Sequence, residues 1–174
     1  MSQLFLEIPE PRHEMEYLKM MERWEATGEK IAPQLLSRYS GRLKKKVSYS
    51  AWLEWCEDDR TTGSALSTGC PCTLFFLAAE DGEILGSIVM NHANTKRGHL
   101  HAGIAPWHQG KGYGSLMLKL ALEKCREFGM STVDIVPYKG NEAAVKTILK
   151  NGGVFLEEFL DDGEASLRYQ IQLL

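Results

Sequence analysis

The sequence predicts an α/β fold in which a mixed, mostly antiparallel sheet is flanked by helices. Residues 73–79 and 84–91 are apolar runs on either side of a short Glu-Asp-Gly-Glu turn, which is typical of an antiparallel hairpin. Residues 104–128 contain three glycines at alternate positions and then a long apolar run, the pattern of a strand end, a tight turn and a helix. Because a hairpin precedes the glycine turn, we expect a fold different from the parallel sheet of a Rossmann domain.

The first half of the chain contributes one strand and two helices to this prediction. Residues 4–8 form an apolar run that two prolines end, so a first strand is expected there. Residues 14–26 carry apolar side chains at helical spacing, and Ser50 is a suitable N-cap for a second helix. Residues 32–47 and 60–71 show no regular pattern. The apolar positions of the two helices are Met15, Leu18, Met20 and Met21, and Trp52, Leu53, Trp55 and Cys56.

The second half alternates between strands and helices after the hairpin. We expect strands at residues 98–104, 132–136, 154–159 and 166–172, and helices at residues 112–128 and 142–151. In the longer helix the apolar residues form one stripe that must pack on the sheet, while the charged residues face solvent. The stripe consists of Leu116, Met117, Leu120, Ala121, Cys125 and Phe128.

The composition predicts one globular domain that spans residues 1–174. Hydrophobic residues make up 44% of the 174 residues and charged residues 25%, which is enough for a single core, and no linker divides the chain. The formal net charge of −3 argues against a dedicated nucleic-acid-binding protein, because such proteins usually carry a basic excess. The chain has no run of about 18 apolar residues and no secretory-type start, so we expect a soluble, cytoplasmic protein with no membrane partner.

The cysteines predict no metal site. They match no zinc-ligand spacing, and Cys70-Pro71-Cys72 lacks the two-residue gap of a redox pair. We therefore expect reduced thiols, with Cys125 facing the core. The chain also has a single basic run, which we interpret as a solvated loop, with attraction of an acidic acceptor as the alternative. This run consists of Arg42, Lys44, Lys45 and Lys46.

The glycine turn predicts a binding site for a phosphate or pyrophosphate group. Gly110, Gly112 and Gly114 place no Cβ atoms beside the unpaired N–H groups that open the following helix. A nucleotide-binding P-loop does not fit, because Lys111 lies between glycines and not after the last one. The Rossmann fingerprint does not fit either, since the spacing is G-x-G-x-G and the turn lies in the second half of the chain. Another phosphorylated cofactor is therefore expected.

The same residues resemble the GNAT superfamily of acetyl-CoA-dependent N-acetyltransferases. Gln109-x-x-Gly112-x-Gly114 is similar to the Q/R-x-x-G-x-G/A pyrophosphate loop of that family, and Ile104-Ala105-Pro106 is similar to the I/V-x-P before it. The segment from Asn141-Glu142-Ala143-Ala144 to Asn151-Gly152-Gly153 is similar to a second family motif. Together with Gly98-His99, these motifs look most like a bacterial subgroup known only as predicted acetyltransferases. The resemblance extends from about residue 75 to about residue 159.

This resemblance implies an acetyl-CoA site with three parts. The pyrophosphate would lie on the N–H groups of residues 110–115, and Lys111 would add a positive charge. The pantetheine arm would pair with the backbone of the fourth strand, where Gly103 has no side chain in the way. Asn141 would hydrogen-bond the pantetheine, or cap the helix that follows it. The implied cofactor-binding residues are Ala102, Gly103, Ile104, Gln109, Gly110, Lys111, Gly112, Tyr113, Gly114, Ser115 and Asn141.

The resemblance also implies direct attack of an amine on the thioester, which requires removal of a proton from the amine. His99 and His101 are candidate bases because they alternate onto one face of the fourth strand, and His92 is a further candidate. Many family members use a tyrosine seven positions after the asparagine as the acid, and this chain has Ile148 there. The thiolate would then leave unprotonated, or take its proton from water, Tyr138 or Tyr113.

These expectations lead to one preferred function and two alternatives. The preferred function is acetyl transfer to a primary amine of a small molecule or peptide, with acetyl-CoA as co-substrate and no metal. The first alternative is an acyl-CoA-binding module or sensor with little turnover, which the absent tyrosine favours. The second is a nucleotide-dependent kinase or oxidoreductase. The C-terminal strand, residues 166–174, is expected to form a long edge that is compatible with a homodimer.

Overall fold

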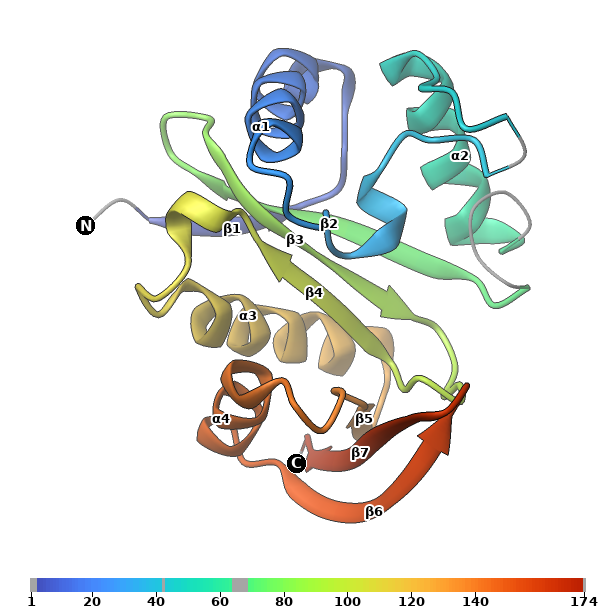
Figure 1. Cartoon of the computed structure of the whole chain (residues 1–174), viewed down its shortest axis with the longest axis vertical. Coiled ribbons are helices and arrows are strands. Elements are labelled where there is room, and N and C mark those ends of the chain that lie inside the picture. The colour runs from blue at the N-terminus through green and yellow to red at the C-terminus, as the bar shows by residue number, and fades with distance from the viewer. Residues whose placement is uncertain (1–2, 42, 64–68, 174) are drawn as a thin grey trace.

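The computed structural model describes residues 3–41, 43–63 and 69–173, so Met1, Ser2 and Arg42 lie outside the described residues. Its strands form two sheets (Figure 1). The first sheet is antiparallel with the order β1–β2–β3–β4, and the second is antiparallel with the order β5–β7–β6. The first consists of β1 (Leu4–Glu7), β2 (Cys72–Ala79), β3 (Ile84–Asn91) and β4 (Leu100–Ile104), and the second of β5 (Thr132–Ile135), β6 (Val154–Asp161) and β7 (Glu164–Gln172).

The two sheets touch at one point and then separate. The His99 N–H donates to the carbonyl oxygen of Asp134 at 2.7 Å, and the Asp134 N–H donates to His99 Nδ1 at 2.9 Å. An isolated bridge joins Gly98 to Ile135 beside these bonds. Beyond this junction β4 pairs only with β3 among the described strands. β4 is therefore an edge strand of the first sheet beyond this junction.

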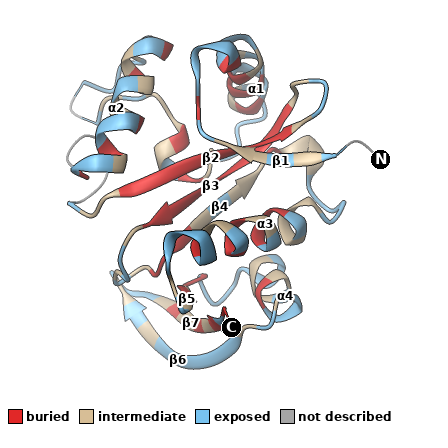
Figure 2. Ribbon diagram, turned by 180° about the vertical axis from the view of Figure 1, so that it is seen from behind, coloured by how far each residue is buried: buried red, intermediate tan, exposed pale blue. Residues whose placement is uncertain are grey.

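Helices cover both faces of the first sheet (Figure 1). On one face, α1 (Glu14–Ala26) and α2 (Tyr49–Thr61) enclose a core that contains the stacked rings of Tyr17, Trp52 and Phe76. On the other face, α3 (Tyr113–Phe128) packs on the sheet and also contacts α4 (Glu142–Lys150). Figure 2 shows the buried residues concentrated on β2 and β3, the central strands. Three short 3₁₀ segments complete the chain: η1 (Pro11–His13), η2 (Gln34–Leu36) and η3 (Pro106–His108).

Most of the predicted elements are confirmed, with ends shifted by a few residues, but three local predictions are wrong. Ser48, not Ser50, caps α2, because its hydroxyl accepts a hydrogen bond from the Ala51 N–H at 3.2 Å. In α1, Met15 is 72% exposed, and Tyr17 and Trp24 complete the buried face beside Met20 and Met21. In α3 the buried face differs from the predicted stripe, since Leu118 and Leu122 are buried whereas Leu116 and Phe128 are exposed. Cys125 is buried as expected.

The second sheet corrects the prediction of a C-terminal edge. β7 lies between β5 and β6, so residues 166–172 form the central strand of this sheet. The free edge belongs to β6, whose residues are mostly exposed (Figure 2). Val154 and Leu160 are 62% and 71% exposed on this strand. Within the described part of the chain, every helix is too short or too polar to cross a lipid bilayer.

Candidate active site

The turn between β4 and α3 is shaped to hold an anion. Gly110 and Gly112 have φ angles of 75° and 87°, a left-handed conformation that side chains other than glycine rarely adopt. A Cβ atom at either position would meet no neighbour within 4 Å, so backbone conformation is what requires glycine here. Gly112 is the N-cap of α3 and provides no side chain to the first N–H groups of the helix. These N–H groups and the helix dipole favour a phosphate group.

Two side chains fix this turn against the rest of the fold. The Gln109 amide Nε2 donates to the Ile104 carbonyl oxygen at 3.0 Å and so closes the turn onto the end of β4. His108 Nε2 lies 2.7 Å from Glu83 Oε1, and the His108 ring meets Tyr113 edge-on with ring centroids 5.8 Å apart. Lys111 is exposed beside the two glycines, where a phosphate can reach it. The predicted residues of the turn therefore lie together.

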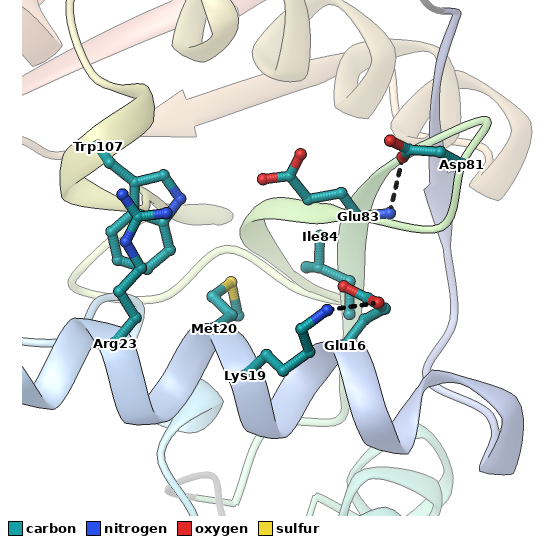
Figure 3. A pocket seen from close by; sticks show the side chains of 8 residues that line it. All are labelled: Glu16, Lys19, Met20, Arg23, Asp81, Glu83, Ile84 and Trp107. Atoms are coloured by element: carbon teal, nitrogen blue, oxygen red, sulfur yellow. Dashed lines mark hydrogen bonds and ion pairs between the residues drawn. The ribbon is translucent and has the colours of Figure 1, made fainter.

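A hollow of about 350 Å³ lies on the far side of η3, between α1 and the turn that precedes β3 (Figure 3). Figure 3 shows the Arg23 guanidinium stacked over Trp107, 4.2 Å from the ring centroid, which ties η3 to α1. Glu83 lines the same hollow while it contacts His108. This region supports the turn from behind and is separate from the open edge of β4.

Gly103 has a role that the sequence did not suggest. A Cβ atom at this position would lie 1.9 Å from the carbonyl oxygen of Ala32 and 2.4 Å from its carbonyl carbon. The backbone between α1 and α2 therefore crosses β4 in direct contact with Gly103. On the α1–α2 face of β4 the missing side chain makes room for this loop. The loop forms a cover over the strand that carries the candidate bases.

His101 is the candidate base that faces this cover. It is paired in register with Val89, which belongs to the core beneath α1 and α2. Its Nε2 lies 3.1 Å from Asn91 Nδ2, and an amide N–H of Asn91 can donate to it. Burial, and then the positive charge of Arg97, lower the pKa of His101. The neutral imidazole that a general base requires is therefore favoured near pH 7.

The other two histidines are engaged differently. His99 Nδ1 accepts a hydrogen bond from the Asp134 N–H, so this ring fastens β4 to β5 where the sheets meet. Burial lowers the pKa of His99, and the nearby negative charge of Asp134 only partly opposes this effect. His92 Nε2 lies 2.8 Å from Thr73 Oγ1, and its ring packs on Phe128, so it lies at the α3 side of the sheet. Among the three, His101 is the nearest along β4 to Gly103, the residue that the loop contacts, and it lies on the same face of the strand.

Arg97 and Tyr138 contact each other near the junction of the two sheets, and Arg97 was not among the residues predicted from the sequence. The Arg97 guanidinium lies 4.5 Å from the centroid of the Tyr138 ring. It donates to Asp161 Oδ2 at 3.1 Å, to Ser166 Oγ at 2.8 Å and to the Val136 carbonyl oxygen at 2.8 Å. Tyr138 is 46% exposed and lies three residues after the end of β5. Arg97 directly precedes Gly98-His99 in the sequence, and this position next to a family motif could have indicated that it lies near the site.

The comparison with known proteins agrees with this geometry. The model of the Acetyltransferase (GNAT) family matches residues 34–152, more than half of the chain. The chain belongs to the GNAT acetyltransferase family. A search of curated protein sequences gave no match.

Solved structures show the same fold. One is the microcin C7 self-immunity acetyltransferase MccE in complex with acetyl-CoA and AMP, with 14% identity and a TM-score of 0.67 over 98% of this chain and 92% of that chain. Another is the spermidine N-acetyltransferase from Vibrio cholerae in complex with CoA and spermine, with 17% identity and a TM-score of 0.63 over 98% and 96%. A dodecameric structure of the Vibrio cholerae enzyme matches with 16% identity and a TM-score of 0.64 over 98% and 94%.

As a GNAT acetyltransferase, the chain departs from the family pattern at Ile148. Ile148 is only 3% exposed and packs in the core between α3 and the second sheet. Its Cγ2 atom would lie 2.4 Å from a Cβ atom on Gly153. Position 148 therefore presents an alkyl group to the core and no hydroxyl that could donate a proton. Within the described residues no three His, Cys, Asp or Glu side chains are grouped to hold a metal ion.

Asn141 and Ser115 take local structural roles in this GNAT fold. The Asn141 Oδ1 accepts a hydrogen bond from the Ala144 N–H at 3.2 Å, so it caps α4. Asn141 is otherwise exposed, which leaves its Nδ2 free to meet a ligand. Asn151 Nδ2 donates to Ser115 Oγ at 3.1 Å and links the end of α4 to the start of α3. The start of α4 is therefore capped by Asn141, and the end of α4 is tied to the start of α3 by Asn151.

We expect Glu83→Ala to weaken acetyl-CoA binding about threefold, because it removes the carboxylate that holds His108 behind the turn. An intramolecular hydrogen bond of this kind contributes about 0.5–1.5 kcal/mol, and the partial exposure of Glu83 places the effect at the lower end. Glu80→Ala is the matched control, since Glu80 is an exposed carboxylate in the same turn. Calorimetric titration measures both. Equal affinities in the two variants would show that the contact does not support the turn.

Proposed function

We propose that this GNAT acetyltransferase transfers the acetyl group of acetyl-CoA to a primary amine of a small molecule or peptide in a ternary complex. The observation that carries the proposal is the open edge of β4, which leads directly into the anion-binding turn at the N-terminus of α3. The peptide-like pantetheine arm fits such an edge, and the pyrophosphate fits such a turn. The neighbours solved with acetyl-CoA, and with CoA and spermine, support this choice of substrates. We propose that residues 1–174 act as one domain.

The residues of the opening have separate tasks in the reaction. Bound acetyl-CoA supplies an activated carbonyl, at which the C–N bond forms as the C–S bond breaks. His101 takes the proton of the attacking amine at Nε2, either directly or through water, once Asn91 gives up its contact with that atom. The thiolate that leaves receives its proton from water or from Tyr138. The loop over Gly103 limits the access of water to this part of β4.

An acyl-CoA-binding module with little turnover is the second candidate. It is favoured by the buried alkyl side chain of Ile148, which replaces the proton donor that many family members have. The deciding experiment measures thiol release from acetyl-CoA with polyamines, aminoglycosides, amino acids and peptides. Release that depends on an amine supports the transferase, whereas CoA binding without release from any amine supports the module. Failure to bind CoA would contradict both.

We expect His101→Ala to lower kcat at least about 100-fold, in the range usual for loss of a general base. Because burial and Arg97 lower the pKa of His101, the acid limb of kcat/KM should have its midpoint below about 6.5 in the wild type. Arg97→Gln removes a positive charge and should move this midpoint to higher pH. His92→Ala is the control and should leave kcat within about twofold, since His92 lies at the α3 side. An unchanged acid limb in His101→Ala would assign the base to another group.

We also propose a homodimer formed through the free edge of β6. An edge strand with exposed apolar side chains commonly pairs with a second chain. Val154, Phe155 and Leu160 are each more than half exposed there. Sedimentation equilibrium gives the mass in solution, and a mass that matches one chain at all concentrations would contradict the dimer.

A further inference from the structure

The loop that covers β4 connects the reacting centre to a second hollow. Its Ala32 backbone rests on Gly103, and His101 lies two residues earlier on the same face of β4. At about 3.4 Å per residue, the two positions are about 7 Å apart along the strand. Ile31, which precedes Ala32, and Gln34, two residues after it, line a hollow of about 430 Å³. The loop that covers β4 at Gly103 therefore also forms one side of this hollow.

The hollow is negatively charged. Its lining contains the carboxylates of Glu25 and Glu29 and the neutral polar side chains of Gln34 and Ser37. The ring of Tyr39 adds an aromatic surface. Among the described residues that line it, no Lys or Arg is present. A carboxylate and an aromatic ring together form a combination that selects an ammonium group.

The chain already places one of its own ammonium groups at this hollow. Lys46 Nζ lies 2.6 Å from Glu25 Oε2 and 5.9 Å from the centroid of the Tyr39 ring. A bridge between Tyr39 and Lys46 brings the lysine to this position. The other carboxylate oxygen, Glu25 Oε1, is enclosed and has no hydrogen-bond partner among the described residues. The site thus accepts a cation and has an acceptor atom left for a second donor.

The Lys46 contact is of a kind that a ligand can displace. The Lys46 side chain is 41% exposed and the Glu25 side chain 28% exposed. Exposed ion pairs of lysine are weak, because solvent screens them and the long side chain loses freedom when it is held. An external ammonium that is already positioned by a second attachment point has a lower entropic cost of binding. Such an attachment point would be the reacting amine at β4.

We propose that this hollow binds the second ammonium group of a dicationic acceptor, an aliphatic diamine or polyamine, and that the acceptor displaces Lys46 from Glu25. The proposal rests on the proposed amine acetylation and adds the substrate class and the residues that select it. Glu25 and Glu29 hold the distal ammonium against Tyr39, while the proximal amine reaches the thioester beside His101. Lys46 competes with the acceptor and neutralises one of the two carboxylates when the acceptor is absent.

The test compares 1,4-diaminobutane with n-butylamine, which has the same chain length and one charge fewer. In the double variant Glu25→Gln, Glu29→Gln we expect KM for the diamine to rise at least about tenfold, with KM for butylamine and acetyl-CoA unchanged. Lys46→Met should lower KM for the diamine about threefold, because it removes the internal competitor. Glu22→Gln is the matched control, since Glu22 is an exposed carboxylate on the same helix outside the hollow.

A binding measurement keeps the two proposals separate. Calorimetric titration with 1,4-diaminobutane in the presence of CoA should show binding to the wild type, tighter binding to Lys46→Met and about tenfold weaker binding to the double variant. This pattern supports the hollow even if no amine is acetylated, a result that would overturn the proposed reaction alone. If amines are acetylated but the diamine and butylamine respond equally to the double variant, the inference fails and the proposed reaction stands.

Discussion

Replacing Gly112 by Asp is expected to weaken acetyl-CoA binding at least about 100-fold, which corresponds to about 2.7 kcal/mol, and to lower acetyl transfer in parallel. Gly112 is the N-cap of α3, so an aspartate there places a negative charge beside the first N–H groups of the helix. Its carboxylate would then occupy the position that a pyrophosphate needs and would repel the ligand. The helix dipole favours this charge, which offsets part of the strain of a non-glycine residue at a φ angle of 87°.

Two control variants separate charge from backbone strain. Gly112→Asn has nearly the same shape and tolerates a left-handed conformation, but it carries no charge, so it should retain much more affinity than the aspartate. Gly129→Asp introduces the same side chain at the other end of α3, where φ is 101°, and should leave the affinity for acetyl-CoA unchanged. Calorimetry gives the affinities and thermal melting shows that each variant is folded. Similar affinities for Gly112→Asp and Gly112→Asn would argue against an anion at this turn.

The glycine turn before α3 was predictable from the sequence because its conformational requirements are local. Left-handed backbone at Gly110 and Gly112 calls for glycine, and the helix that begins at Tyr113 follows without a break. The spacing of the glycines in the sequence is enough to predict the turn and the start of the helix, and the structure has both. The same holds for the hairpin of β2 and β3, whose turn residues and apolar runs lie next to each other in the chain. Elements of this kind need no knowledge of distant contacts.

The contacts that support the ends of β4 were not predictable because they join residues that are distant in the sequence. Arg97 meets Val136 across a separation of 39 positions, and His108 meets Glu83 across 25. The hydrophobic periodicity of a sequence does not indicate which distant residues form such pairs. The buried face of α3 has the same cause, since Leu118 and Leu122 are buried in a core to which several elements contribute. A helix pattern shows which residues are apolar, but its neighbours decide which of them are buried.

Gly103→Ala is expected to destabilise the fold, because Gly103 lies against the backbone of Ala32. Gly103→Ala adds one methyl group, whose carbon would lie 1.9 Å from the Ala32 carbonyl oxygen. Because both obstructing atoms belong to the backbone, no side-chain rotation can relieve the overlap, and the loop between α1 and α2 must move away from β4. We expect a loss of about 3 kcal/mol in the free energy of unfolding, at the upper end of the usual cost of overpacking. For a chain of this size this lowers the melting temperature by about 6–12 °C.

Gly140→Ala is the matched control for this loss. Gly140 has no atom within 4 Å of an added Cβ and no left-handed φ angle, so its alanine variant should be neutral or slightly more stable. If the Gly103 contact fixes the cover, Gly103→Ala should also expose Lys30 and Arg38, which belong to the loop, to faster cleavage by trypsin, while Gly140→Ala is cleaved like the wild type. KM for the amine should rise in Gly103→Ala, because the displaced loop carries the hollow lined by Glu29 and Gln34. An unchanged melting temperature and cleavage rate would mean that the loop is free to lift from β4, and the cover would then be a mobile lid instead of a fixed wall.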